Sequence, residues 1–89
     1  MTKYGIPPYV HFRRLASEVM LLDDRTDAYF GLNESAALIW AALAEGRTLE
    51  DAVDDIVDRS DVVPEIARTD AKALIAQLIE RGLLEIVET

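Results

Sequence analysis

The chain has 89 residues, no cysteine and a formal net charge of −8, and 51% of its residues are hydrophobic. This length predicts a single domain over residues 1–89, and the lack of cysteine excludes disulfides and thiolate metal sites. The negative charge argues against nucleic-acid binding, and the lack of a long apolar run or a signal-peptide pattern predicts a cytoplasmic protein without a membrane span.

The first part of the chain has the pattern of three short strands. Pro7–Pro8 disfavours helix, so we expect residues 1–8 to be an extended N-terminal segment. Residues 9–15 alternate in polarity, residues 18–23 form an apolar run of strand length, and residues 28–32 follow a polar turn. Short strands separated by tight polar turns predict a three-stranded antiparallel sheet.

Two helices are expected to follow the strands directly. Asn33 is a good N-cap for the first helix, and Gly46 is suited to end it. Trp40 lies on the apolar side of this helix, so we expect it to pack in the core. The segment Thr48–Asp51 resembles a capping box at the start of the second helix.

The last helix is predicted over residues 64–81. Pro64 suits its first position, and Gly82 suits a left-handed C-terminal cap. Residues 83–87 form either a final short strand or an apolar tail on the core. The element order β-β-β-α-α-α therefore predicts an α+β domain of winged-helix-like character.

Acidic side chains occupy the face of the second helix that lies opposite its apolar positions. They are Glu50, Asp51, Asp54, Asp55 and Asp58. A solvated face is the simpler interpretation, and a docking surface for a basic partner is the alternative.

No motif in the sequence supports catalysis or the binding of a metal or cofactor. His11 is the only histidine, and no nucleophile is paired with a base near it in sequence. The turn with Asp23, Asp24 and Asp27 lacks the further oxygen ligands of a calcium loop, so a solvated turn is the simpler interpretation. We therefore expect a binding protein with no metal or cofactor rather than an enzyme.

The third strand is the candidate for a binding edge. A three-stranded sheet has two edges with unpaired backbone groups, and proteins usually protect such edges with charge or proline. Pro7–Pro8 lies beside the first strand, whereas residues 28–32 contain neither proline nor lysine. An exposed edge of this kind accepts a peptide as an added strand. The alternative is that the chain's own tail covers this edge.

Several segments together resemble the PqqD-like family of precursor-peptide recognition elements for ribosomally synthesised and post-translationally modified peptides (RiPPs). They are Leu21–Asp23, Tyr29–Trp40, Thr48–Asp51, Asp70 and Leu74–Leu84. The resemblance covers roughly residues 8–87 and implies a three-stranded sheet followed by three helices. It also implies a non-catalytic protein that binds the leader segment of a precursor peptide and presents it to modifying enzymes.

A stand-alone chain of this length most resembles the leader-binding subunit of lasso-peptide biosynthesis. This resemblance implies a separate leader peptidase of transglutaminase-like type as partner, with the cyclase as a further candidate. The leader would add as a strand in a groove between the third strand and the third helix. The implied strand side is Asp27, Ala28, Tyr29, Phe30, Gly31 and Leu32. The implied helix side comes from the groove-facing part of Arg68, Asp70, Ala71, Leu74 and Gln77.

Three alternatives remain open from the sequence. The closest is the peptide chaperone of pyrroloquinoline quinone (PQQ) biosynthesis, which fold alone does not separate from the lasso-peptide subunit. A winged-helix transcription regulator has a compatible element order, but the net charge of −8 argues against it. An acidic carrier protein fits the size, but Ser35 and Ser60 lack the expected Asp-Ser-Leu context.

Overall fold

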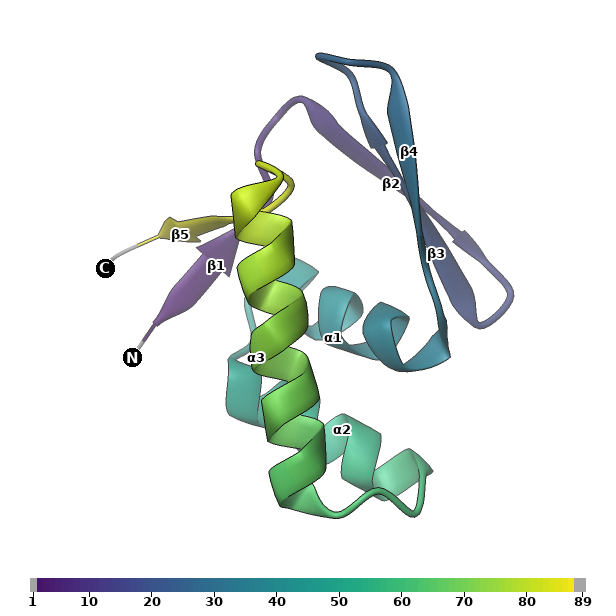
Figure 1. Ribbon diagram of the computed structural model, residues 1–89, viewed down its shortest axis with the longest axis vertical. Helices are drawn as coiled ribbons and strands as arrows, with labels where there is room; N and C mark the ends of the chain where they lie inside the picture. The colour runs from purple at the N-terminus through teal and green to yellow at the C-terminus, as the bar shows by residue number, and fades with distance from the viewer. Residues whose placement is uncertain (1, 88–89) are drawn as a thin grey trace.

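The computed structural model describes residues 2–87, with strands in the first part of the chain and three helices after them (Figure 1). In chain order the elements are β1 (Lys3–Gly5), β2 (Val10–Leu15), β3 (Glu18–Asp23), β4 (Ala28–Leu32), α1 (Glu34–Ala44), α2 (Leu49–Arg59), α3 (Pro64–Glu80) and β5 (Glu85–Val87). The predicted α+β order of three strands followed by three helices is confirmed. The structure adds a short strand near each end of the chain.

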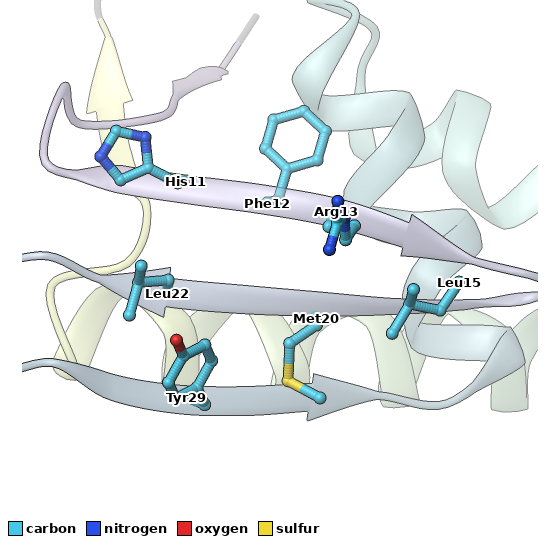
Figure 2. Close-up of a pocket in the computed structure, with 7 residues that line it drawn as sticks. All are labelled: His11, Phe12, Arg13, Leu15, Met20, Leu22 and Tyr29. Carbon is cyan, nitrogen blue, oxygen red and sulfur yellow. The ribbon is translucent and has the colours of Figure 1, made fainter.

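The main sheet is antiparallel with the strand order β2-β3-β4. Because side chains alternate between the two faces of a strand, Val19 and Leu21 of β3 lie on one face together with Leu32 of β4. All three side chains are buried, and α1 packs on this part of the sheet. Figure 2 shows Met20 and Leu22 on the opposite face, and no helix among residues 2–87 covers that face (Figure 1).

A second, two-stranded antiparallel sheet joins the two ends of the chain, because β1 pairs with β5. A Cβ atom on Gly5 would lie 2.7 Å from Cγ2 of Val87, so glycine allows the two strands to approach closely. Leu83 and Leu84 are buried, and residues 85–87 form the strand. The final segment is therefore both a core contact and a strand. Met1, the first residue of the expected extended segment 1–8, lies outside the described residues.

The predicted helix ends are confirmed by their capping bonds. The Asn33 side chain accepts a hydrogen bond from the first turn of α1. The Thr48 side chain accepts a bond from the backbone of Asp51, whose carboxylate accepts a bond from the Thr48 backbone, so the capping box is complete. Gly46 and Gly82 have positive φ angles of 80° and 75°, the left-handed conformation that glycine adopts after a helix.

The acidic face of α2 is partly engaged within the protein. Glu50 pairs with Arg68 of α3 at 2.9 Å, and Asp55 pairs with Arg47 at 2.9 Å. The Arg68 hydrogen bonds lower the pKa of the Glu50 carboxyl. With Asp51 in the capping box, three of the five acidic side chains have structural partners, so much of this face serves the fold rather than solvent alone.

The core forms around α1, which contacts the other two helices and the sheet. Trp40 of α1 is completely buried, as the sequence predicts. Phe12 of β2 meets the Trp40 ring edge to face, with ring centres 5.6 Å apart. The largest other side chains with almost no exposure are Leu21, Leu43, Val53 and Leu83. The sheet, the helices and the final segment therefore share one core.

Candidate functional site

β4 is an exposed strand edge. Among residues 2–87 it pairs with β3 on one side and has no strand on the other. The C-terminal strand β5 pairs with β1, so the alternative that the tail covers β4 is wrong for the part of the tail that the structure describes, up to residue 87. The other edge strand, β2, carries His11, Arg13 and Arg14, whereas β4 carries no charged residue. Because charge discourages strand addition, β4 is the more receptive edge.

The strand register decides which backbone groups of β4 are available. The loop between β2 and β3 has two residues, so its closing pair, Leu15 and Glu18, exchanges both backbone hydrogen bonds. Bonded pairs alternate along an antiparallel ladder, so the even-numbered residues of β3 bond to β2 and the odd-numbered residues bond to β4. Odd-numbered residues of β3 face even-numbered residues of β4. The N–H and C=O groups of Tyr29 and Gly31 therefore point toward the free edge.

A groove of about 240 Å³ runs between β4 and α3. Its lining is mostly apolar, with three polar side chains. The lining residues are Phe30, Gly31, Leu32, Asn33, Ala36, Leu74, Gln77, Leu78, Arg81 and Leu83. A peptide strand paired with β4 would place alternate side chains toward this groove. The arrangement suits an extended peptide with apolar side chains.

The structure brings part of the implied strand side into the groove. Phe30, Gly31 and Leu32 line it. Tyr29 projects from the opposite face of the sheet and is 67% exposed, so its backbone rather than its side chain faces the edge. Asp27, in the turn before β4, has a φ of 57°, and Ala28 begins the strand. These last residues lie beyond the groove lining.

The implied helix side divides in the same way. Leu74 and Gln77 line the groove. Ala71 is completely buried in the core, and the Arg68 guanidinium is directed toward α2, where it binds both carboxylate oxygens of Glu50 at 2.9 Å. Asp70 is exposed and lies outside the groove lining. The structure therefore brings Leu74 and Gln77 together with β4, and it does not bring Arg68, Asp70 or Ala71 there.

Arg81, which the sequence did not single out, is the charged residue of the groove. Its guanidinium carbon lies 5.0 Å from the centre of the Phe30 ring, a cation–π contact between the end of α3 and β4. The helical spacing from Leu74 through Gln77 to Arg81 follows i, i+3 and i+7. That periodicity places all three on one helix face and was available from the sequence.

The outer face of the sheet carries a second, separate hollow of about 330 Å³. Leu15, Met20, Leu22 and Tyr29 supply apolar side chains from three adjacent strands, with Arg13 and His11 on the β2 side. Figure 2 shows Leu22, Tyr29 and Met20 close together over β3 and β4. This hollow and the groove meet β4 from opposite faces of the sheet.

A charged pair lies at the end of β3, near one end of the groove. Arg25 binds the Asp23 carboxylate through side-chain and backbone hydrogen bonds, and these bonds hold the pKa of Asp23 below its usual range. The Asp23 oxygens are thus occupied by Arg25. Within residues 2–87, no three His, Asp or Glu side chains are grouped to hold a metal ion. No helix in the same range is long and apolar enough to cross a membrane.

A comparison with known protein families identifies the family of this chain. Residues 18–84, which include β3, β4 and all three helices, match the family described as Coenzyme PQQ synthesis protein D (PqqD). The chain belongs to the PqqD family. The PqqD-like resemblance seen in the sequence is thereby confirmed, and the matched region contains every residue that lines the groove.

Two solved structures are similar to this PqqD-family protein over most of its length. One is described as TbiB1 in complex with the TbiA(beta) leader peptide. It has a TM-score of 0.84 and 32% sequence identity, and the match covers 91% of this chain and 94% of that chain. Another is described as lasso peptide synthetase B1 complexed with the leader peptide. It has a TM-score of 0.83 and 27% identity, with 97% and 99% of the two chains covered.

A search among curated proteins finds no match to this PqqD-family chain.

Proposed function

We propose that this PqqD-family protein binds the leader segment of a ribosomally synthesised precursor peptide in lasso-peptide biosynthesis. The observation that carries the proposal is the free edge of β4, which faces α3 across a groove with both apolar and polar lining residues. Both similar solved structures are described as complexes with a leader peptide. A leader segment bound here would extend the β2-β3-β4 sheet by one strand.

The physical basis of binding would be divided between backbone and side chains. Tyr29 and Gly31 would exchange main-chain hydrogen bonds with the leader, which gives affinity with little dependence on sequence. Phe30, Leu74 and Gln77 would contact its alternate side chains and select apolar ones. Strand residues from Asp27 to Leu32 thus form the proposed strand side of the site. Arg81 joins Leu74 and Gln77 on the helix side, whereas Arg68, Asp70 and Ala71 lie outside the groove lining.

The proposed role is recognition without catalysis. PqqD-like leader-binding proteins are non-catalytic recognition elements, and the groove lining contains no nucleophile paired with a base. We propose that the bound leader is presented in the cytoplasm to a transglutaminase-like leader peptidase, with the cyclase as a further partner. The acidic net charge of −8 supports a peptide ligand rather than nucleic acid.

The direct test is titration of a fluorescein-labelled leader peptide, taken from the neighbouring precursor gene, by fluorescence anisotropy. Tyr29→Pro removes an outward-pointing N–H and leaves the bonds between β4 and β3 in place. We expect saturable binding by the wild type and a loss of at least about tenfold in the variant, since main-chain bonds supply the affinity. Arg14→Pro is the matched control. By the same alternation of bonded pairs, the backbone N–H of Arg14 points outward at the other edge of the sheet, on β2.

Two results would contradict the proposal. A folded Tyr29→Pro protein that binds the leader like the wild type would show that the β4 edge is not the site. A wild-type protein that binds a PQQ precursor peptide and not a lasso-peptide leader would favour the PQQ chaperone, which the family description makes the second candidate. The presentation step is tested by adding the neighbouring peptidase, whose cleavage of the precursor should accelerate with the wild type and not with Tyr29→Pro.

A further inference from the structure

Four residues tie the end of α3 to the end of the sheet, and they form what we call the Arg25 cluster: Tyr9, Asp23, Arg25 and Gly82. Arg25 donates from Nε and Nη2 to the two Asp23 carboxylate oxygens at 3.1 and 2.9 Å. Its guanidinium carbon lies 4.0 Å from the centre of the Tyr9 ring. The Tyr9 hydroxyl donates to the Gly82 carbonyl oxygen at 2.8 Å. These contacts join segments 73 positions apart in the chain.

The Arg25 cluster lies beside both walls of the groove. Gly82 is the residue between Arg81 and Leu83, which line the groove on the α3 side. Arg25 Nη2 also donates to the Arg81 carbonyl oxygen at 3.4 Å. On the sheet side, Asp23 pairs with the first residue of β4. Any movement within the cluster would therefore displace the two walls relative to each other.

The geometry of the cluster is specific to arginine. The Asp23 side chain is only 5% exposed, and it receives two parallel N–H donors from one planar guanidinium. The same plane stacks on Tyr9, which an ammonium group cannot reproduce together with the two-pronged bond. A Cβ on residue 82 would lie 2.6 Å from Arg25 Nη2, so Gly82 leaves the space that the guanidinium occupies.

We propose that Arg25 is a positioning residue for peptide binding, which sets the gap between β4 and α3 without forming part of the groove lining. This inference rests on the proposed function. α3 packs on α2 and touches α1, and its polar and cation–π contacts with the sheet side are concentrated at its C-terminal end, in the cluster and at Arg81. A strand that adds to β4 must fit beside α3. A gap fixed in advance lowers the conformational cost of binding.

The binding test compares three arginine variants by leader anisotropy, at a temperature where circular dichroism shows each variant folded. Arg25→Met should weaken leader binding by about tenfold, because the gap is no longer fixed. Arg25→Lys, which keeps the charge but loses the two-pronged bond and the stacking, should not restore affinity. Arg68→Met is the matched control, since Arg68 pairs with α2 away from the groove, and it should change affinity by less than about twofold.

The second test measures the gap without any peptide. The chain has no cysteine, so spin labels at Tyr29→Cys on β4 and Ala76→Cys on α3 report the distance between the two walls by electron–electron dipolar spectroscopy. We expect Arg25→Met to broaden the distance distribution and Arg68→Met to leave it unchanged. If Arg25 only stabilised the fold, Arg25→Met would lower the melting temperature and leave the distance distribution of the folded protein unchanged.

The outcomes separate this inference from the proposed function. If the wild type binds no leader, the proposed function fails, and the positioning role of Arg25 in leader binding fails with it, whatever the spin labels show. If the wild type binds and a folded Arg25→Met protein shows the same affinity and the same distance distribution, the positioning role alone is overturned. Restoration of full affinity by Arg25→Lys would likewise overturn it in favour of a simple charge effect.

Discussion

The guanidinium of Arg81 lies 5.0 Å from the centre of the Phe30 ring, so the end of α3 and the middle of β4 meet across the groove. Phe30 is half-buried, and the Arg81 side chain is exposed beside it. Arg81 is the one charged residue among those that line the groove. In a protein of net charge −8, this places a local positive charge where the peptide is proposed to lie.

Replacing Arg81 with methionine should weaken leader binding in a salt-dependent way. Methionine keeps the apolar stem and removes the charge, so an acidic or carbonyl group of the leader loses its partner. The contact with Phe30 is worth about 0.5–1 kcal/mol at an exposed site, so the free energy of unfolding should fall by no more than that. Anisotropy titrations at low and high salt measure the leader affinity of both proteins. The difference in affinity between variant and wild type should become smaller at high salt, because screening weakens the contact that Arg81 makes in the wild type.

A comparison with Arg59→Met, at the end of α2 and away from the groove lining, controls for the change in net charge. Equal affinity losses in both variants would mean that overall charge, and not the position of Arg81, controls binding.

Two glycines should respond in opposite ways to alanine. Gly31 has no positive φ, and a Cβ there would meet no atom within 4 Å. Gly31→Ala should therefore raise the free energy of unfolding by about 0.4–1 kcal/mol, because alanine reduces the conformational entropy of the unfolded chain. Gly82→Ala should lower it by about 1–2 kcal/mol or more, since φ is +75° and the new Cβ would collide with Arg25. Urea denaturation measures both, and a stabilised Gly82→Ala protein would contradict the assigned geometry.

The capping box should contribute to stability and not to recognition. Thr48→Ala removes the side-chain oxygen that accepts a bond from Asp51, and the free energy of unfolding should fall by about 1 kcal/mol. Leader affinity of the folded variant should stay unchanged, because Thr48 lies outside the groove lining. Ser35→Ala, an exposed position in the first turn of α1, is the neutral comparison. A large loss of affinity in Thr48→Ala would mean that the start of α2 takes part in binding.

Local patterns in the sequence predicted most of the fold, because the residues that form each turn or helix cap lie close together in the chain. The polar turns, the Asn33 and Thr48 caps and the two C-terminal glycines each act within a few residues, and each is present in the structure. Strand β1 escaped prediction because three residues carry no recognisable alternation. Its formation depends on β5, which lies at the other end of the chain.

The site was predictable in outline and not in detail, for a related reason. An edge without charge and a helix that follows it are visible in the sequence, but the rotation of α3 about its axis is set by packing. Ala71 turned out to be a core contact and Arg68 an α2 contact, whereas Arg81 faces the groove. The Arg25 cluster was also not predictable from the sequence, because the residues of a polar turn do not indicate a contact with Gly82, far away in the chain.

Low pH should lower the free energy of unfolding, and protonation of Asp23 should account for a measurable part of this decrease. Its hydrogen bonds from Arg25 lower the folded pKa of Asp23 below the ordinary value of about 4, and the bonds at Glu50 and Asp51 act in the same direction. Because the unfolded chain binds protons first, this stabilisation is full above the ordinary pKa values. It is lost as pH falls through the lowered ones.

Urea denaturation between pH 7 and pH 3 should therefore show a falling free energy of unfolding below about pH 4–5. Asp23→Asn cannot titrate, so it should be less stable than the wild type at pH 7, and the difference between the two proteins should shrink as pH falls. A constant difference between wild type and Asp23→Asn down to pH 3 would contradict a lowered Asp23 pKa.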